Sequence, residues 1–474
     1  MQITNFLESQ LRKQLQHYYM TEPRFSHKQA QLGQKIWTIL FIAFYLLGIP
    51  SIASAQIVPD ATLPNNSVVT PNGDRVEITG GTEAGGNLFH SFEEFSVPTG
   101  GTAFFNNPSQ IENIISRVTG GSISNIDGLI RANGAANLFL LNPNGIVFGS
   151  NASLNIGGSF IGSTANSIKF SDGTQFSALD TRTSLLTVSV PLGLQYGSNS
   201  GAIVVQGSGN NLSLNPANYE FIRNDRPVGL QVQPGQTLAL VGGNVTLESG
   251  NLTAQQGRIE LGSVDGGSVK LTPTYPGWTL NYQDVSTFQD ISLTGAASVD
   301  TSGSGGGDIQ VQGRRITLTD GSVILTDTLG NSMGGNLIVR ATDAVEAIGI
   351  SANNPFYSGL FADVTTDATG GGGNLTIDTQ RLLVADGAQV GASTFGAGNA
   401  GNFTVRAKNV ELIGGSPFGP SGLCPAQAFA ARYGYRDLYA HRISGQSGGP
   451  ASGYVAREPT HQSRIGGASA LYRL

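Results

Sequence analysis

The sequence predicts an all-β protein, a parallel β-helix with an N-terminal β cap and an aberrant or disordered C-terminal tail. Two observations of composition support this prediction. Glycine accounts for 66 of the 474 residues and only 12% of residues are charged, yet 39% are hydrophobic. In the middle of the chain the hydrophobic residues alternate with polar ones, which is the period of a strand with one buried face. Gly and Pro interrupt the chain too often for long helices.

Residues 1–55 have the order of charge and hydropathy of a secretory signal peptide. Two lysines precede a run of fourteen mostly apolar residues, 36–49. At about 1.5 Å per residue this run spans roughly 21 Å as a helix, short of the ~30 Å core of a bilayer. Ala53 and Ala55 form an A-x-A site, so we expect cleavage before Gln56. An uncleaved membrane anchor is the alternative.

The positive region before the apolar run is long for a signal peptide. Three leucines recur at every fourth position within residues 3–18, which predicts a helix there. Two interpretations stay open: an extended signal peptide of an exported protein, or translation that starts at Met20 instead of Met1.

Strand candidates at the start of the remaining chain are the apolar pairs near residues 68–69, 76–78 and 104–105. In a stack of β-coils every strand pairs with the coils on either side, so only the two ends of the stack are open edges. We expect these first strands to cap one of those edges.

Beyond residue 200 a five-residue motif recurs: a Gly, a polar residue, an apolar residue, any residue, and a second apolar residue. It occurs at residues 243–247, 250–254, 257–261, 267–271, 307–311, 335–339, 373–377 and 401–405. The polar residues Asp308, Asn336, Asn374 and Asn402 are 28, 38 and 28 positions apart, so Asn336 and Asn402 are 66 apart. This predicts about three coils of roughly 22 residues per 66, with residues 353–357 bulging out as a loop. Gly, Asn and Asp tolerate the positive φ of the sharp turns that coils need.

Charge and cysteine content restrict the partners and the compartment. Residues 56–423 carry fifteen basic and twenty-eight acidic residues, while both ends are positive. This balance disfavours nucleic acid, whose binding requires Lys and Arg to neutralise phosphates. The single cysteine, Cys424, permits no intramolecular disulfide, which suits a chain that crosses a periplasm unfolded.

Residues 128–149 consist of short apolar strands separated by Asn-Gly and Asn-Pro-Asn-Gly turns. Their centre resembles the signature of the haemagglutination-activity domain of filamentous haemagglutinin-like two-partner secretion exoproteins, of the cyanobacterial type. The signature residues are Asn142, Pro143, Asn144, Gly145 and Ile146. The resemblance covers roughly residues 56–423, is most specific in 56–165, and includes residues 106–107, 114–121, 128–130, 155–160, 229–235 and 238–243.

The resemblance implies a right-handed β-helix that is secreted or displayed on the cell surface through the periplasm and outer membrane. Together with the signal peptide and the change in composition near the C-terminus, the resemblance divides the chain into four segments: a signal peptide (1–55), a secretion domain (56–165), a β-helix continuation (166–423) and an anomalous tail (424–474). The implied partners are an outer-membrane transporter with polypeptide-transport-associated domains and, for an adhesin, a glycan or protein receptor on a host cell or other surface. A second Asn-Pro-Asn-Leu motif of many relatives has no clear counterpart here, and residues 106–108 come nearest.

Residues 142–146 have two interpretations, which are compatible. Asn-Pro-Asn-Gly forms a good β-turn on its own, with Pro fixing φ and Gly supplying a positive φ. The alternative is that the transporter binds these side chains directly.

An enzyme is the first competing class, because parallel β-helices also host polysaccharide-active enzymes. His90 is the one histidine between residues 56 and 423, so a nucleophile–histidine pair or a His/Cys metal cluster is not expected. Glu93 with Glu94, and Arg314 with Arg315, are adjacent pairs that point to opposite faces of a strand. Residues 305–308 faintly resemble a calcium nonapeptide repeat but do not recur. We expect no enzymatic activity, no catalytic residue, no cofactor and no metal; a structural surface-layer or matrix protein is the second alternative.

The composition changes after residue 423. Residues 424–474 contain no Asn and no Lys, hold five of the thirteen Tyr, and break the strand motif in mid-repeat. We hypothesise translation in a shifted frame; a genuine cap or a disordered tail is the alternative.

Overall fold

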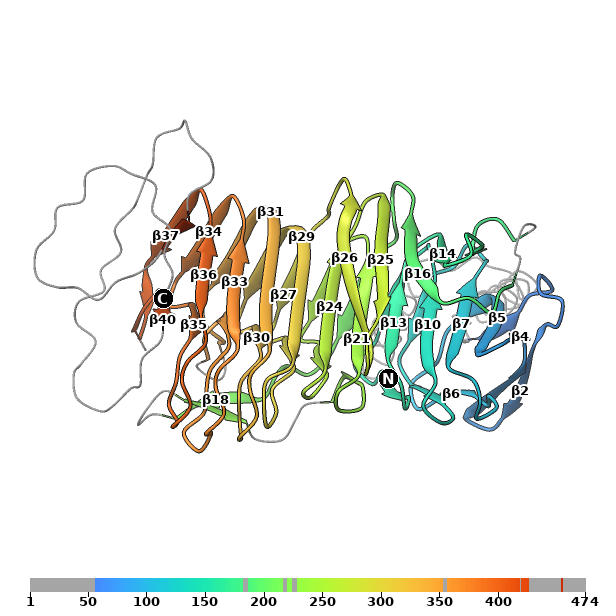
Figure 1. Ribbon diagram of the computed structural model, residues 1–474, viewed down its shortest axis with the longest axis horizontal. Helices are drawn as coiled ribbons and strands as arrows, with labels where there is room; N and C mark the ends of the chain where they lie inside the picture. Colours follow the sequence, from blue (N-terminus) through green and yellow to red (C-terminus); the bar gives the residue numbers. More distant parts are fainter. Residues whose placement is uncertain are drawn as a thin grey trace, which may run out of the picture. The chain divides into compact units, whose positions relative to one another are not determined.

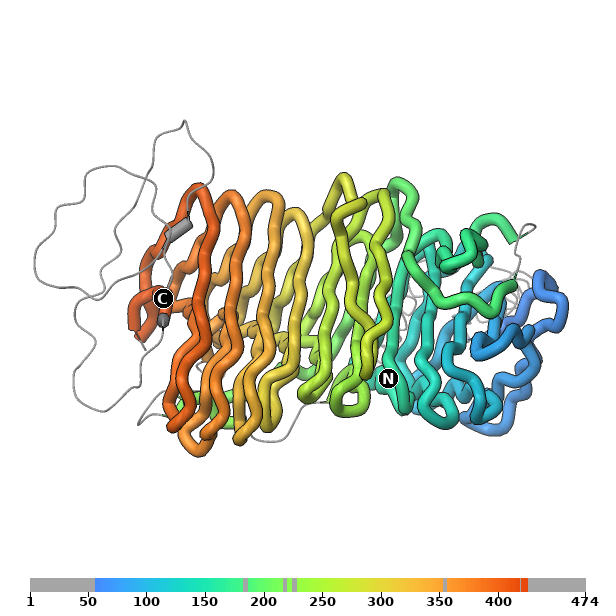
Figure 2. Tube along the Cα trace, viewed as in Figure 1, coloured from blue at the N-terminus to red at the C-terminus, as the bar shows by residue number. Residues whose placement is uncertain are grey.

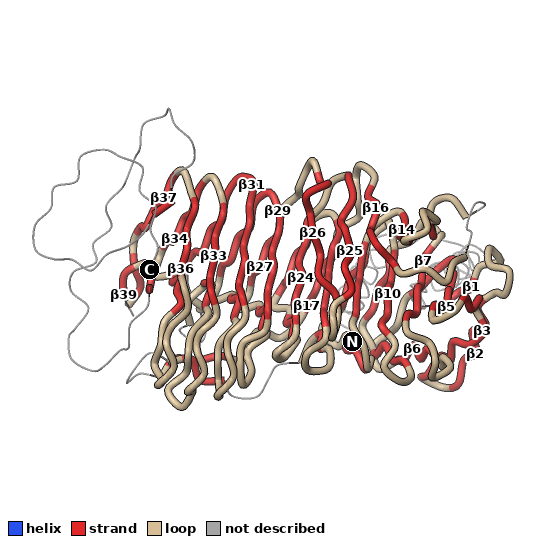
Figure 3. The backbone as a smooth tube through the Cα atoms, in the orientation of Figure 1, coloured by secondary structure: helices blue, strands red, loops and turns tan. Residues whose placement is uncertain are grey.

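The computed structural model describes residues 56–181, 186–215, 220–223, 228–352, 356–417, 419–425 and 453–454. The chain divides into two units, Met1–Ser54 and Ala55–Leu474, and all described residues belong to the second. The predicted signal peptide with Ala53 and Ala55, the predicted helix over 3–18, Met20 and most of the predicted tail lie outside them. All regular secondary structure in these ranges is β-strand, which confirms the all-β prediction (Figure 3). No membrane-spanning helix is found in these ranges.

The described part of the second unit is a parallel β-helix (Figures 1 and 2). The chain runs in coils, and the strands of successive coils pair in parallel to form three walls, which each coil passes in the order first, second, third. The first wall consists of β5 (Asn87–Phe95), β7 (Asn113–Val118), β10 (Asn137–Leu141), β13 (Phe160–Ser163), β21 (Thr237–Gly242), β24 (Arg258–Ser263), the first halves of β29 (Asp308–Thr319) and β31 (Asn336–Ile348), β33 (Asn374–Asp378) and β36 (Phe403–Arg406).

The second wall consists of β8 (Ser124–Ile126), β11 (Ile146–Phe148), β17 (Ile203–Gln206), β22 (Val245–Glu248), β27 (Ile291–Thr294), the second halves of β29 and β31, β34 (Arg381–Ala385) and β37 (Asn409–Ile413). The third wall is formed by two sheets, the first of β6 (Thr102–Phe105), β9 (Leu129–Ala132) and β12 (Ser153–Asn155). Its second sheet holds β20 (Leu230–Gln231), β23 (Asn251–Thr253), β28 (Ser298–Asp300), β30 (Val323–Leu325), β32 (Gly359–Phe361), β35 (Gln389–Ala392) and β40 (Gly422–Pro425).

One apolar core runs through the centre of all the coils. Parallel pairing aligns apolar residues of successive coils, so that their side chains stack along the first wall. Ile259, Ile309 and Leu337 are paired in this way. These three side chains are 0–1% exposed. Burying one such side chain contributes roughly 1.5–3 kcal/mol, so the repeated apolar positions of the sequence motif dominate the stability of the fold.

The glycine of the recurring motif is required by close contact between coils rather than by a turn. A Cβ atom added to Gly307, Gly335, Gly373 or Gly401 would lie 2.2, 2.3, 2.0 or 1.9 Å from the carbonyl oxygen of the equivalent glycine in the preceding coil. Any larger residue would therefore separate the coils. Positive φ occurs at Gly267 (105°), in the copy of the motif that lies in β25 (Gly267–Pro273), and at Asp320 (56°) in a turn after β29.

The predicted coil length of roughly 22 residues is correct for some coils: Thr237 of β21 pairs with Arg258 of β24, 21 residues later. Asn137 Nδ2 donates to Asn113 Oδ1 in the preceding coil across 24 residues, and Ser159 N donates to Asn137 Oδ1 across 22 residues. Further along, the segment 336–402 forms two coils and not the predicted three, because β31 pairs directly with β33 and β33 with β36. The prediction failed because β31 alone has thirteen residues and continues through two walls.

The longer of these two coils has its extra residues between β31 and β32. The predicted bulge falls here; its residues 353–355 are among those not described, but its last two, Phe356 and Tyr357, are 1% and 8% exposed. They are buried instead of projecting into solvent.

The N-terminal cap is present. β1 (Ile57–Pro59) and β4 (Thr82–Ala84) pair antiparallel with β5. β2 (Ser67–Asn72) and β3 (Arg75–Gly80) form a hairpin, and β3 pairs in parallel with β6. The strands expected near 68–69 and 76–78 thus belong to the cap, whereas Phe104 and Phe105 lie in β6, a strand of the third wall.

Two excursions build a five-stranded antiparallel sheet on the outer face of the first wall. The sheet contains β14 (Ser167–Phe170), β15 (Gln175–Ser177), β16 (Pro191–Tyr196), β25 (Gly267–Pro273) and β26 (Trp278–Val285). A second apolar cluster fills the space between, with Phe139 of the wall packed edge-on against Trp278 of the sheet at 5.4 Å between ring centroids. This outer sheet explains why β7, β10, β13 and β21 are apolar on both faces.

The remaining described strands are short. β18 (Leu212–Leu214) and β19 (Phe221–Arg223) form an antiparallel hairpin, as do β38 (Gly415–Ser416) and β39 (Gly419–Pro420). β41 (Gly453–Tyr454) pairs antiparallel with β36. Cys424 lies in β40, which pairs in register with β35, so the strand pattern includes the first two residues of the predicted tail.

Candidate functional site

The signature residues form the corner between the first and second walls. The Asn142 carbonyl accepts a hydrogen bond from Gly145 N (3.1 Å), and Asn142 Oδ1 accepts one from Asn144 N (3.0 Å). The Asn142 side chain is fully buried, and its Nδ2 donates to Ser122 O and Ser124 Oγ, both at 3.0 Å. Asn142 therefore fixes the turn to the preceding coil.

The following coil also contacts this corner, which leaves few atoms of the turn open to solvent. Gly201 N donates to Pro143 O, and Ile146 N donates to Ala202 O, both at 3.0 Å. Gly145 has φ +129°, a conformation that favours glycine.

Within the signature, Asn142, Gly145 and Ile146 are buried, Pro143 is half-buried and Asn144 is exposed. The exposed Asn144 still donates from Nδ2 to Gly120 O at 2.7 Å.

A comparable corner exists at residues 106–108, the nearest counterpart of the second Asn-Pro-Asn-Leu motif of many relatives. Asn107 Oδ1 accepts from Asn133 N at 2.9 Å, and Asn133 Nδ2 donates to Asn106 Oδ1 at 2.7 Å. Asn107 is 5% exposed. These asparagines thus join successive coils between the third and first walls, as Asn142 does at its own corner.

Arg117 of β7 is a fully buried cation that connects the cap, the first coils and the outer sheet. Its Nε donates to Ser91 Oγ (2.8 Å), its Nη2 to Thr62 Oγ1 (2.9 Å) and its Nη1 to Ser177 O (2.5 Å). The guanidinium also lies 4.2 Å from the centroid of the Phe176 ring. Burial lowers the pKa of Arg117 to about 10, against the opposing charge of Asp60, so Arg117 stays charged at neutral pH.

Asp60 in the cap is the counter-charge of this cluster. Its carboxylate accepts hydrogen bonds from Thr119 Oγ1 (2.6 Å), Ser91 Oγ (2.7 Å) and Thr62 Oγ1 (2.5 Å). Burial raises the pKa of Asp60, but these hydrogen bonds outweigh it and hold the pKa below its usual value. The cap is therefore locked to the first two coils by a charged pair.

Five of the eight copies of the recurring motif lie on the first wall, and their polar residues form part of a column along it. Asn113 Nδ2 donates to Asn87 Oδ1, and Asn374 Nδ2 to Asn336 Oδ1, both at 3.0 Å. Equivalent register positions are occupied by Asn87, Asn113, Asn137, Ser159, Thr237, Arg258, Asp308, Asn336, Asn374 and Asn402. Each member hydrogen-bonds to a neighbouring coil, so the motif's polar position is structural.

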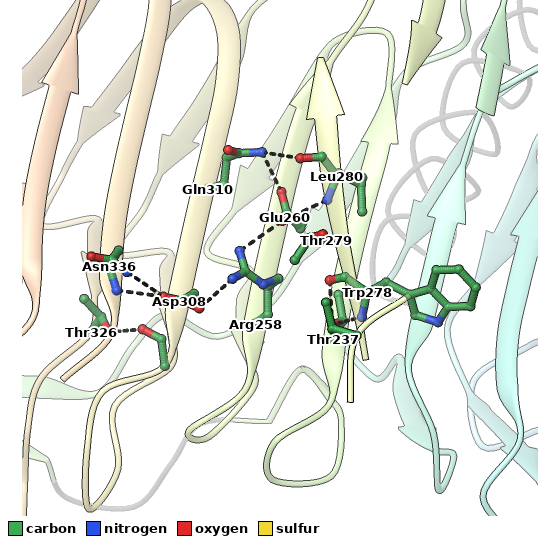
Figure 4. Close-up of polar contacts among 12 residues, drawn as sticks. Thr237, Arg258, Glu260, Trp278, Thr279, Leu280, Asp308, Gln310, Thr326 and Asn336 are labelled. Carbon is green, nitrogen blue, oxygen red and sulfur yellow. Dashed lines mark hydrogen bonds and ion pairs between the residues drawn. The ribbon is translucent and has the colours of Figure 1, made fainter. Parts of the chain in front are cut away.

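Glu260 lies where the outer sheet ends on the first wall (Figure 4). This carboxylate is fully buried and accepts from Gln310 Nε2 (3.0 Å), from Leu280 N and from Arg258 Nη1 (both 3.3 Å). Thr237 Oγ1 likewise accepts from Trp278 N at 2.9 Å. Side chains of the wall thereby satisfy backbone groups of β26, the edge strand of the outer sheet.

Burial raises the pKa of Glu260 to about 7, with Arg258 acting in the opposite direction. The Arg258 guanidinium also pairs with Asp308 (2.5 Å), whose Oδ1 accepts from Asn336 N (2.8 Å), so the junction and the polar column share residues (Figure 4).

The other residues that the sequence singled out have structural surroundings. His90 is 1% exposed with Nδ1 2.9 Å from Ser67 Oγ, and burial lowers its pKa to about 3. Glu93 is exposed and Glu94 partly exposed. Arg314 pairs with Asp290 at 2.6 Å, and Arg315 with Asp343 at 2.9 Å. Across the described ranges no group of three or more His, Cys, Asp or Glu is arranged to hold a metal ion.

The sequence analysis did not single out Arg117, Glu260 or Arg223, three largely buried ionisable residues that connect separate parts of the fold. A signal existed for Arg117, since it interrupts the apolar run Ile114–Val118 of β7. Glu260 and Arg223 have no such signal because strands and turns that are distant in the sequence bury them.

A capped parallel β-helix with polar corner turns and an antiparallel sheet on its first wall defines a class of protein, the β-solenoid. Residues 55–311 match the family model described as the TPS secretion domain. The chain belongs to this family and is a two-partner secretion exoprotein. Membership implies an outer-membrane transporter as its partner and a secreted or cell-surface location.

Two solved structures are similar to this chain. The HMW1 secretion domain from Haemophilus influenzae is 16% identical, with 72% of this chain and 89% of that chain covered and a TM-score of 0.42. The filamentous hemagglutinin secretion domain is also 16% identical, with 78% and 99% covered and a TM-score of 0.35. A comparison with curated proteins gave no match.

Proposed function

We propose that the transporter recognises this passenger in the periplasm through the N-terminal coils, at the surface formed by Pro143 and Asn144. The observation that carries the proposal is the division of the signature into buried and accessible residues. Asn142 and Gly145 are buried. Asn144 is exposed, and it lies beside a corner where the apolar Ile123 is 45% exposed. Within residues 56–165 the turn is held to the preceding coil by the side chains of Asn142 and Asn144. It therefore presents the side chains of Pro143 and Asn144 with little conformational entropy to lose on binding.

The proposal includes the route expected from the sequence. Residues 1–55 direct export and are removed before Gln56, and the transporter's polypeptide-transport-associated domains bind the secretion domain, 56–165. The chain crosses the outer membrane unfolded, and the β-helix continuation, 166–423, folds outside as an adhesin for a glycan or protein receptor. Support for the adhesive role is the family resemblance alone.

The proposal includes no enzymatic activity. The stacked carboxylates Asp327 and Asp363 are 1% and 6% exposed, so a polysaccharide has little access to them. Asp327 pairs with Arg223, and Asp363 Oδ1 accepts a hydrogen bond from Ser393 N at 2.6 Å.

The test separates recognition of the turn from its role in folding. Pro143→Ala and Asn144→Asp should reduce export through the transporter several-fold, and more than they reduce refolding of the purified residues 56–423. Asn142→Ala is the matched control: it removes the side-chain hydrogen bonds to Ser122 O, Ser124 Oγ and Asn144 N, and should lower stability by about 1–3 kcal/mol, so that refolding and export fall together. If Pro143→Ala and Asn144→Asp reduce export and refolding equally, these residues act only as a turn.

A further inference from the structure

The hairpin of β18 and β19, here called the strap, lies against coils that come much later in the chain. The strap follows β17 in sequence, yet it lies along the third wall beside β30 (Figure 1). Asn210 Nδ2, just before β18, donates to Gly321 O (3.0 Å), 111 residues away. Thr366 N donates to Glu220 Oε1 (2.8 Å) across 146 residues. The strap therefore connects distant parts of the solenoid.

Apolar side chains make up most of this contact. The Phe221 ring lies 4.8 Å from the Phe356 ring and 4.6 Å from the Phe361 ring, between centroids. Leu212 is 6% exposed and belongs to the same cluster as Val323 of β30. Without the strap, this part of the third wall would expose a separate apolar patch.

A buried ion pair completes the contact. Arg223 pairs with Asp327 and donates from Nη2 to Ser302 Oγ at 3.2 Å. Asp327 Oδ1 accepts from Asp363 N at 2.8 Å, which places the two carboxylates in successive coils. Burial and the charge of Asp327 both raise the pKa of Asp363. Burial also raises the pKa of Asp327, and the charge of Arg223 acts in the opposite direction. The strap thus supplies the cation that pairs with a buried carboxylate, and a buried charge without a partner is destabilising.

Most contacts of the strap lie beyond the segment that the family model matches. The family match covers residues 55–311, which include the strap. Gly321, Val323, Asp327, Phe356 and Phe361 all lie beyond residue 311. The surface on which the strap docks exists only after these downstream coils have formed.

We propose that the strap is a latch that closes last: it docks after β30 and β32 have folded and then joins the segment that follows β17 to the downstream coils. The proposal depends on these contacts alone and not on how the transporter recognises the chain. Contacts between residues so far apart in the sequence form slowly, because loop closure is required before they contribute to stability.

The first test follows the order of folding in the unmodified purified protein. During refolding, pulsed hydrogen exchange should show the amides of 212–214 and 221–223 becoming protected after those of 323–328 and 359–363. Protection of the strap before or together with β17 and β21, ahead of the downstream coils, would overturn the proposal.

The second test asks whether the folded strap opens independently. Phe221→Ala should accelerate native-state exchange of 212–214 and 221–223 by about tenfold or more and leave 238–242 and 259–263 unchanged. Ile222→Ala is the matched control, since Ile222 is 39% exposed in the same strand and should change neither region. Equal acceleration in every region would show that the strap is part of one cooperative unit and not a latch.

Discussion

Buried ionisable side chains at three positions hold the separate parts of this molecule together. Arg117 joins the cap and the outer sheet to the first coils, Glu260 joins the outer sheet to later coils, and Arg223 joins the strap to the downstream coils. In each case the charged group hydrogen-bonds to partners outside its own strand. Removing one such group leaves its partners buried without hydrogen bonds, which costs more than the net stability of the bond itself.

Glu260 makes stability depend on pH near neutrality. Its folded pKa, about 7, lies above its usual value because of burial. The folded protein therefore keeps a proton that the unfolded chain releases, and the free energy of unfolding falls as pH rises from about 4.5 to about 7. In Glu260→Gln this fall should be absent.

Urea denaturation at several pH values from 4.5 to 8 measures this effect. His90 contributes the opposite slope, because its lowered pKa makes stability fall as pH drops below about 6.5. The informative quantity is therefore the difference between Glu260→Gln and the unmodified protein, in which the His90 contribution cancels. A constant difference across this range would show that Glu260 does not titrate there.

These residues also show the limit of sequence-based prediction at this scale. Arg117 and Glu260 occupy wall positions whose side chains point away from the core, and such positions are normally solvated. They are buried here because the outer sheet, formed by residues 167–196 and 267–285, covers that face. The period of the strand predicts which face a side chain occupies, but not what covers that face.

At the scale of the strand, the recurring motif fixes how coils stack. Its glycine permits the close approach of neighbouring coils, and its polar residue hydrogen-bonds from coil to coil. The sequence predicted the strands correctly from the alternation of apolar residues. The sequence analysis explained the glycine by turn geometry. The close approach could not be predicted, because it depends on contacts with the preceding coil, which is distant in the sequence.

The hydrogen bonds of the polar column should contribute most to the free energy of unfolding where the side chains are buried. Asn113 is 7% exposed and bonded on both sides, to Asn87 and Asn137, whereas Asn374 is exposed. Asn113→Ala should lower the free energy of unfolding by about 1–3 kcal/mol, since it leaves buried amide groups unpaired. Asn374→Ala, in the same column, should cost less than about 1 kcal/mol because water replaces its partners. Chemical denaturation of both variants measures this, and equal losses would contradict the assignment.

On the second wall, charges alternate in sign from coil to coil. Asp290 pairs with Arg314 (2.6 Å), Arg381 with Glu346 (2.7 Å) and with Glu411 (2.9 Å). A slip by one coil would place like charges on neighbouring strands, which is destabilising. Because the apolar positions of successive coils are nearly interchangeable, this alternation helps to specify the correct stacking.

At the scale of the whole molecule, the secretion domain and the downstream coils form one continuous solenoid. The fold class and the cap could be predicted from the sequence, because they depend on local strand alternation and on turn residues. Coil lengths could not, because excursions interrupt the repeat: Thr237 N donates to Ser159 Oγ in the preceding coil although 78 residues separate them. Nothing in the local pattern distinguishes residues that leave the solenoid from residues that continue it.

The measurement that tests the central claim most directly is export of this chain from a two-membrane host with and without a cognate two-partner transporter. The account predicts that the folded chain appears in the medium or on the cell surface only when the transporter is present. Retention of a folded chain in the periplasm in both cases would contradict it.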